Sequence, residues 1–222
     1  MSALSDFRPL SSLARAPRRC RLSAALGLAL STLAACSTVP PKSAPVTGPQ
    51  FQQDESGFTV LEDVRVAPAV RADYDNAIRL LEQRQYDQGI PLLLKVTQGA
   101  PQASAPHVDL GIAYSRSGDL EKALASLQRA VEINPRQPVA YNELGMVYRR
   151  KGDFTAARAS YEKALALYPG FHFARLNLAI LCDLYLADLP CALDNYQAYQ
   201  QAVPDDKQAA MWVADVRART KH

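Results

Sequence analysis

The chain has 222 residues, of which 48% are apolar and 21% charged, with a formal net charge of +3. This composition supports a buried core and excludes an intrinsically disordered chain, and four Cys are too few for a small disulfide framework. Residues 1–35 hold five Arg and one acid, which leaves 20 basic and 21 acidic residues, a net charge of −1, in the remainder. Because that remainder has no basic excess to neutralise phosphates, we expect no nucleic-acid binding.

The N-terminal residues 1–35 are typical of a secretory signal. Three Arg in residues 18–21 precede an uncharged run over residues 22–35, and this run is shorter than the roughly 20 apolar residues that span a bilayer. The run ends in Leu33-Ala34-Ala35-Cys36, which resembles a bacterial lipobox. The resemblance implies a lipoprotein signal peptide over residues 1–35 and an acylated Cys36 at the mature N-terminus. The alternative is an ordinary signal with a Cys at this position by chance.

The segment 36–69 is predicted to be a Pro-rich tether followed by an extended piece. Residues 37–50 combine several Pro with no apolar period, which is typical of a semi-extended linker. Ser37 follows the lipobox Cys, and by resemblance to lipoprotein sorting signals this favours a lipid-anchored location in the outer membrane, facing the periplasm. Residues 51–68 carry Phe58 and several Val. They either form a short extended piece against the first repeat or remain mobile.

A 34-residue period organises residues 70–206. We place four units at 70–103, 104–137, 138–171 and 172–206, the last with one extra residue. The two central units share seven residues at this spacing, namely Gly111, Tyr114, Gly118, Asp119, Ala123, Ala130 and Pro135 in one and Gly145, Tyr148, Gly152, Asp153, Ala157, Ala164 and Pro169 in the other.

Each unit is predicted to be a helical hairpin. Apolar residues at spacings of three and four predict its first helix. Gly118 can end that helix in the left-handed conformation, and Asp119 can cap the next helix. The pattern resembles the tetratricopeptide repeat (TPR), which implies an all-α solenoid with a concave face made by the first helices. Pro91 should kink or delay the second helix of unit one. Residues 207–222 are predicted to form a capping helix and tail.

No residue constellation in the sequence points to catalysis. We find no Gly-rich phosphate loop, no nucleophile elbow and no cluster of His with carboxylates. His107 and His172 are interpreted as surface or packing residues, and we expect neither a metal nor a cofactor. The favoured function is a non-enzymatic interaction scaffold, and the alternative is an envelope enzyme with an unrecognised active site.

The resemblance to TPR lipoproteins implies a protein or peptide partner in the cell envelope. Three kinds of envelope machine use similar proteins: pilus or secretin assembly, the coordination of peptidoglycan enzymes, and energy-coupled transport. The sequence does not choose among them.

Two further Cys remain after the signal is removed. Cys182 and Cys191 are nearly symmetric about the hairpin turn of the fourth unit, where facing helices bring Cα atoms within reach of a disulfide, and the periplasm is oxidising. We therefore predict a bond between them. The alternative is that both are small buried apolar residues.

Three columns of first-helix residues are predicted to form a peptide-binding groove, by resemblance to the repeat family. One column is apolar and one is mostly acidic, so an extended or helical peptide with alternating apolar and basic residues is the best-matched ligand. Alternatively, part of the apolar column packs between adjacent helices. The predicted groove residues are Tyr74, Val108 and Asn142; Asp75, Asp109, Glu143 and Asn177; and Ile78, Ile112, Met146 and Ile180.

Overall fold

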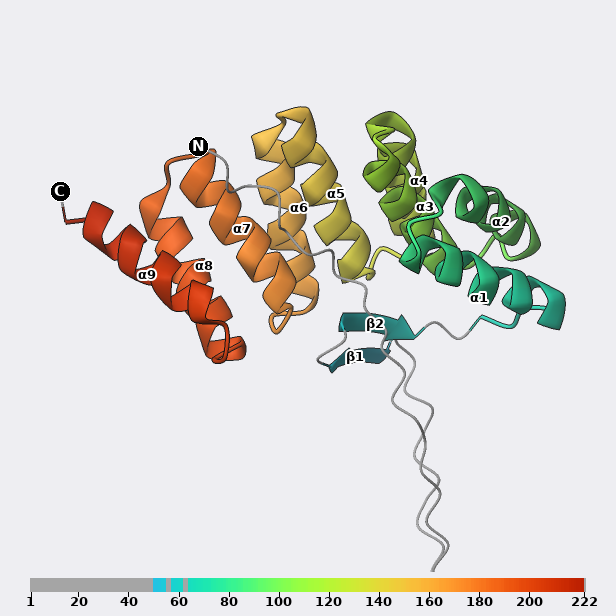
Figure 1. Cartoon of the computed structure of the whole chain (residues 1–222), viewed down its shortest axis with the longest axis horizontal. Coiled ribbons are helices and arrows are strands. Elements are labelled where there is room, and N and C mark those ends of the chain that lie inside the picture. The colour runs from blue at the N-terminus through green and yellow to red at the C-terminus, as the bar shows by residue number, and fades with distance from the viewer. Residues whose placement is uncertain (1–49, 55–56, 62–63, 222) are drawn as a thin grey trace, which may run out of the picture.

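A computed structural model of the chain describes residues 50–54, 57–61 and 64–221. The predicted signal peptide, Cys36 and the tether up to residue 49 lie outside the described residues. In the described part, two strands precede nine helices (Figure 1): β1 (Gln50–Asp54), β2 (Gly57–Leu61), α1 (Pro68–Glu82), α2 (Tyr86–Gly99), α3 (Ala105–Ser117), α4 (Leu120–Ile133), α5 (Pro138–Lys151), α6 (Phe154–Leu167), α7 (His172–Leu184), α8 (Leu189–Ala202) and α9 (Lys207–Arg219).

The helices form an arc of stacked hairpins (Figure 1). Each first helix packs against its own second helix, as α3 does against α4, and each second helix packs against the next first helix, as α4 does against α5. Buried side chains continue from one hairpin to the next, so the core runs the length of the arc, with Leu93, Leu127 and Tyr161 among its largest members. The predicted all-α solenoid is confirmed.

The turn within every hairpin contains a residue in the left-handed region. The roles predicted for Gly118 and Asp119, and for the same pair in the next unit, are confirmed: each glycine ends a helix and each aspartate caps the following one. The first and fourth units use a non-glycine residue instead. The φ angles are 60° at Arg84, 97° at Gly118, 81° at Gly152 and 52° at Ala187.

The capping aspartate of the fourth turn comes one residue later than those of the central turns. In unit two the Asp119 N–H donates to the Tyr114 carbonyl at 2.9 Å, across five residues. In unit four the Asp188 N–H donates to the Cys182 carbonyl at 2.8 Å, across six residues. This difference accounts for the extra residue needed to align the last unit with the others.

The C-terminal helix α9 lies at the end of the arc (Figure 1). Its buried face carries Ala209, Val213 and Val216, and the Trp212 ring lies 5.4 Å from the Tyr196 ring of α8. The apolar side chains at helical spacing therefore cover the last hairpin, as predicted for a capping helix.

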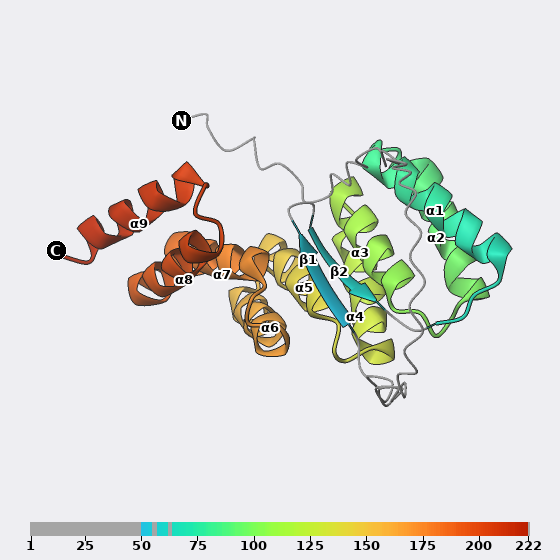
Figure 2. The ribbon, with the colours of Figure 1, turned by 90° about the horizontal axis from the view of Figure 1, so that it is seen from below.

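The delay predicted for the second helix of unit one needs correction, and the segment predicted to be extended contains two strands. Helix α2 begins at Tyr86 and continues through Pro91 to Gly99, so the proline does not delay it. The segment before the repeats forms an antiparallel hairpin of β1 and β2, and this hairpin lies beneath α3 and α5 and not against the first repeat (Figures 1 and 2). Among the described residues, no helix has both the length and the hydropathy to cross a bilayer.

Candidate peptide-binding face

The side of a first helix that faces away from its partner helix can be identified from two glycines. A Cβ on Gly111 would meet Leu127 of α4, and a Cβ on Gly145 would meet Tyr161 of α6. Asp109 and Glu143 stand two residues before these glycines, about 200° around the helix. They therefore lie on the side of α3 and α5 that is opposite the second helices. We call this side of α1, α3, α5 and α7 the inner face.

The predicted groove residues differ widely in exposure. Val108, Asn142 and Ile180 are 5%, 2% and 6% exposed, so they belong to the interior and present almost no surface to a partner. Asp75 is exposed, and the others are partly buried: Tyr74, Asp109, Glu143, Asn177, Ile78, Ile112 and Met146.

The apolar column serves the core as well as the inner face. Ile78, Ile112 and Met146 each pack against a different buried cluster while remaining partly exposed. Both interpretations of the column therefore apply: these side chains contribute to packing between hairpins, and their outer surfaces remain available to a ligand.

Hydrogen bonds between successive first helices form what we call the polar ladder. Each bond joins residues 35 apart, one more than the repeat period, and so connects neighbouring units. Groups of residues 34 apart in the sequence do not predict these pairs. The bonds are Tyr74 Oη to Asp109 Oδ2 at 2.6 Å, Arg150 Nη1 to Ser115 Oγ at 2.9 Å, and Asn177 Nδ2 to Asn142 Oδ1 at 2.9 Å.

The two central carboxyl groups of the inner face are desolvated. Burial raises the pKa of Asp109 to about 6, although the hydrogen bond from Tyr74 and the charge of Arg116 oppose the rise. Burial also raises the pKa of Glu143, against the Arg116 charge and a hydrogen bond from the Asn142 amide. Arg116, which is not among the predicted groove residues, therefore acts on both acids. Asp109 is mostly ionised at neutral pH and loses its charge in mild acid.

The acidic column is not uniform along the arc. The Asp75 side chain on α1 is 63% exposed and lies 3.5 Å from the Arg71 guanidinium on the same helix. Such a solvent-exposed ion pair contributes little stability, and the Arg71 charge offsets that of Asp75. The acids with a distinct environment are therefore those of α3 and α5.

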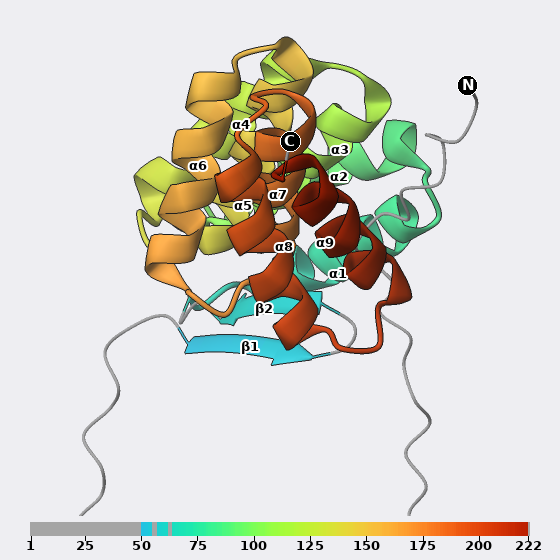
Figure 3. The same cartoon turned by 90° about the vertical axis from the view of Figure 1, so that its left-hand side faces the viewer.

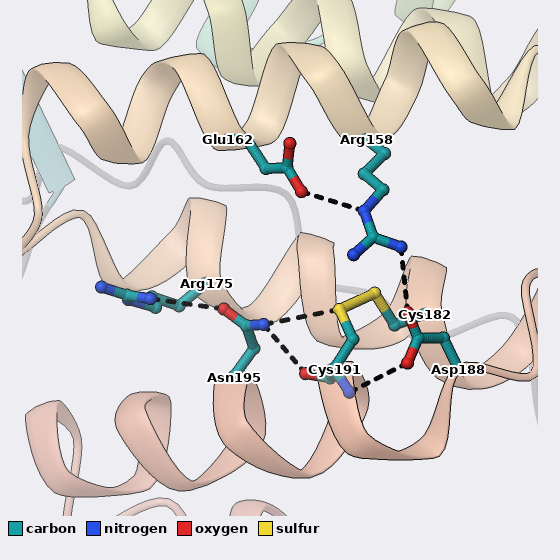
Figure 4. Close-up of a disulfide and its surroundings, with 7 residues drawn as sticks. All are labelled: Arg158, Glu162, Arg175, Cys182, Asp188, Cys191 and Asn195. Carbon is teal, nitrogen blue, oxygen red and sulfur yellow. Dashed lines mark hydrogen bonds and ion pairs between the residues drawn. A yellow bond between two sulfur atoms is a disulfide. The ribbon is translucent and has the colours of Figure 1, made fainter.

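Cys182 and Cys191 form a disulfide between α7 and α8, with Cα atoms 5.9 Å apart (Figure 4). Asp188 in the intervening turn accepts hydrogen bonds from the Cys191 N–H at 3.1 Å and from Arg158 of α6 at 2.9 Å. The backbone bond and then the Arg158 bond hold the Asp188 pKa below its usual value. The turn of unit four is therefore linked covalently within its hairpin and by an ion pair to unit three.

One group in the described part of the chain has the spacing of metal ligands, namely Cys182, Asp188 and Cys191, whose ligand atoms lie within 4.8 Å of one another. Its two sulfur atoms are bonded to each other, and metal coordination by Cys needs a thiolate. The oxidised chain therefore offers only the Asp188 carboxylate at this place.

Comparison with known proteins identifies the repeat. The tetratricopeptide-repeat family model matches residues 74–138, 108–171 and 142–182. A comparison with curated proteins finds no match. Among solved structures, TTC0263, a thermophilic TPR protein in Thermus thermophilus, is 26% identical with a TM-score of 0.58, over 67% of this chain and 81% of that one.

Two other solved structures have lower sequence identity. PilF of Pseudomonas aeruginosa is 17% identical with a TM-score of 0.63, over 69% of each chain. The first TPR of Spaghetti (RPAP3), bound to an HSP90 peptide, is 18% identical with a TM-score of 0.52, over 55% of this chain and 95% of that one. These likenesses concern the fold. Residues 74–182 of this chain are therefore tetratricopeptide repeats, and the arc of helices that contains them is a TPR solenoid.

Proposed function

We propose that this chain is a non-enzymatic scaffold that binds a segment of a partner protein on its inner face. The observation that carries the proposal is the combination of half-buried apolar and acidic side chains on α3 and α5: Ile112 and Met146 lie beside Asp109 and Glu143 in the helical order. The solved RPAP3 repeat, which holds a peptide of HSP90, supports peptide binding by this fold. The acids favour a segment with apolar and basic residues.

We further propose that the scaffold is a lipoprotein anchored through Cys36 in the outer membrane and facing the periplasm. This part rests on the lipobox resemblance and on Ser37. Several acyl chains on one Cys would hold the chain stably, because each buried CH₂ contributes about 0.8 kcal/mol. The partner would belong to an envelope machine for pilus or secretin assembly, the coordination of peptidoglycan enzymes or energy-coupled transport.

Neutral substitutions on the inner face test the binding site. Asp109→Asn with Glu143→Gln keeps the shape of both side chains and should weaken capture of the partner from envelope extracts and flatten its salt dependence. The matched control is Glu132→Gln with Asp194→Asn, which removes two exposed acids from the second helices α4 and α8. Equal capture by both double variants would show that the partner uses another surface.

The raised pKa of Asp109 adds a pH readout. Because this pKa is about 6, the carboxylate is protonated between pH 7 and pH 5, and capture of a basic segment should weaken over that interval. The single variant Asp109→Asn should remove most of this pH dependence. An unchanged pH profile in the variant would assign the dependence to another group.

The anchor has its own test. Cys36→Ser should leave an unprocessed or soluble form, measured by fractionation of membranes and by the size of the chain. A variant that still fractionates with outer membranes at the mature size would refute lipidation at this residue. Crosslinking in cells followed by mass spectrometry would then identify the partner and choose among the three envelope machines.

A further inference from the structure

The hydroxyl group of Tyr161 in α6 is buried and has no hydrogen-bond partner in the described part of the chain. Buried polar side chains are nearly always hydrogen-bonded, so this one needs an explanation. A Cβ on Gly145 would lie 2.5 Å from the Tyr161 ring, and the ring therefore lies directly against α5. Burial raises the pKa of Tyr161. The hydroxyl thus keeps its proton at neutral pH and remains a donor without an acceptor.

The fourth unit shows what a tyrosine in this column binds. Tyr196 of α8 occupies the same column once the extra residue is counted, and its Oη donates to Asp183 Oδ2 at 3.4 Å. The same carboxylate pairs with Arg219 of α9, which lies with α8 at the near end of the arc in Figure 3. In unit four, a carboxylate therefore lies between a tyrosine hydroxyl and an arginine.

The third unit has both donors but lacks the carboxylate. Arg149 stands 34 residues before Asp183, one helical turn after Gly145 and on the same side of α5. Among the described residues Arg149 forms no ion pair. Its guanidinium carbon instead lies 5.7 Å from the centre of the Tyr185 ring. Unit three therefore combines the Tyr161 hydroxyl with an arginine where unit four has an acid.

An apolar surface adjoins these donors at the C-terminal ends of α5 and α7, two helices that contact each other. Leu184 and Tyr185 are 61% and 46% exposed. The Tyr185 ring also packs against the Phe154 ring, with the ring centroids 5.0 Å apart. We call Arg149, Phe154, Leu184 and Tyr185 the end patch.

The charge around the end patch favours an anion. The last turn of α5 carries three basic residues, at 149–151, and one of them pairs with Glu121. The charge of Arg149 lowers the pKa of Tyr161, and the opposite effect of Glu143 is smaller. The donors and the charge therefore agree on the kind of group that fits here.

We propose that the end patch binds an acidic and apolar segment of a partner protein. A carboxylate of that segment accepts hydrogen bonds from Tyr161 Oη and from the Arg149 guanidinium, as in the fourth unit. An apolar neighbour in the segment packs on Leu184 and Tyr185. Arg149 leaves the Tyr185 ring to bind the carboxylate, because a charge-assisted hydrogen bond is stronger than an exposed cation–π contact. This surface is separate from the acids of the inner face, so the proposal does not rest on the proposed function.

The missing acceptor is tested in the free chain. Tyr161→Phe removes a buried donor that has no partner, so the midpoint of urea unfolding should stay the same or rise. The matched control, Tyr196→Phe, removes a hydroxyl that donates to Asp183 and should lower the midpoint. A similar loss in both variants would show that Tyr161 has a partner in the free chain, such as a bound water, and would overturn the proposal.

Binding is tested with a blocked peptide of alternating Leu and Glu, compared with the same peptide carrying Gln in place of Glu. The unaltered chain should bind the Glu peptide at least about tenfold more tightly, because hydrogen bonds to a charged group are stronger. Tyr161→Phe and Arg149→Gln should each remove most of this preference. The control Arg217→Gln removes an exposed charge from α9 and should leave it unchanged. No preference in the unaltered chain, or one that survives both variants, would overturn the proposal.

Amide chemical shifts locate the bound peptide. The Glu peptide should shift the ends of α5 and α7 around Arg149 and Leu184, and shifts confined to other helices would contradict the site. Asp109→Asn with Glu143→Gln should leave this binding unchanged or tighten it. If that double variant instead abolishes it, the peptide binds the inner face and the end patch is refuted. Failure at the end patch with intact partner capture at the inner face leaves the proposed function standing.

Discussion

The turns of the second and fourth units join similar helical hairpins but place different residues in the left-handed conformation. Gly118 takes a φ of 97° at no steric cost, because it has no Cβ. Ala187 takes a φ of 52°, a conformation that costs a residue with a Cβ about 1–2 kcal/mol. The fourth hairpin also carries the Cys182–Cys191 disulfide. The fourth hairpin has Ala187 where the central units have glycine, and it keeps the hairpin geometry with a disulfide next to its turn.

The first unit shows the same loss without that bond. Arg84 has a φ of 60°, and Gln85, at the start of α2, makes no capping side-chain hydrogen bond. Asp119 and Asp188 make that bond in units two and four. Unit four thus lacks only the turn glycine, whereas unit one lacks both the glycine and the capping aspartate and has the fewest local supports.

Among substitutions at the features that distinguish these units, removal of the disulfide should lower the free energy of unfolding most. Cys182→Ala with Cys191→Ala opens a loop of nine-residue separation and should lower the free energy of unfolding by roughly 2.5–3 kcal/mol in the chain-entropy description. Urea unfolding followed by circular dichroism measures the loss. A reducing agent should lower the unaltered chain to the level of the variant and leave the variant unchanged. A reductant-insensitive midpoint in the unaltered chain would contradict the prediction.

The next largest loss of stability is expected at Gly145, where the two helices of a central unit approach closely. A Cβ at Gly145 would lie 2.5 Å from the Tyr161 ring, which is fully buried. Gly145→Ala should therefore cost about 2 kcal/mol of stability through overpacking. The fourth unit already holds Ala179, which is fully buried, in this column, and Ala179→Gly should cost about 2 kcal/mol through lost helix propensity and the lost burial of its methyl group. A Gly145→Ala variant as stable as the unaltered chain would show that the Tyr161 ring moves to accommodate the added Cβ.

The central turn itself should be less sensitive. A Cβ at Gly152 meets no atom within 4 Å, but its φ is 81°, so Gly152→Ala should cost about 1 kcal/mol from backbone strain alone. Asn tolerates the left-handed region better than Ala, and Gly152→Asn should recover part of the loss. Thermal unfolding of the two variants compares them, and an Asn variant less stable than the Ala variant would refute the strain explanation.

The smallest effect is expected at the fourth turn. Ala187→Gly relieves the strain but increases the freedom of the unfolded chain, so the net gain should be about 0.5 kcal/mol. The same substitution in the chain without the disulfide supplies the control. A larger gain in that background would show that the bond holds Ala187 in place.

The fold could be predicted from the sequence because the repeat signals are local. Gly118, Asp119 and their copies 34 residues on mark where each helix ends and the next begins, and the observed helices α3 to α6 follow that pattern. Pro91 was harder to interpret: it stands in the sixth position of α2, where burial of the neighbouring Leu93 favours the helix despite the missing donor.

The candidate site was less predictable because it depends on how neighbouring units are staggered. Tyr74 was grouped with Val108 at a spacing of 34, but its hydroxyl donates to Asp109. Burial divides each column in turn, since Ile180 is interior while Ile112 reaches the surface. The β1–β2 hairpin has no repeat signal, because its residues lie before the first unit of the 34-residue period.

The polar ladder has a mechanical consequence. Its bonds connect α1 to α3, α3 to α5 and α5 to α7, and hence lie along one edge of the arc. Because these bonds hold neighbouring first helices together, we expect a change in the curvature of the arc to move the second helices more than the first helices. The curvature of the solenoid would then change through the spacing of the second helices, while the spacing of the first helices stays nearly constant.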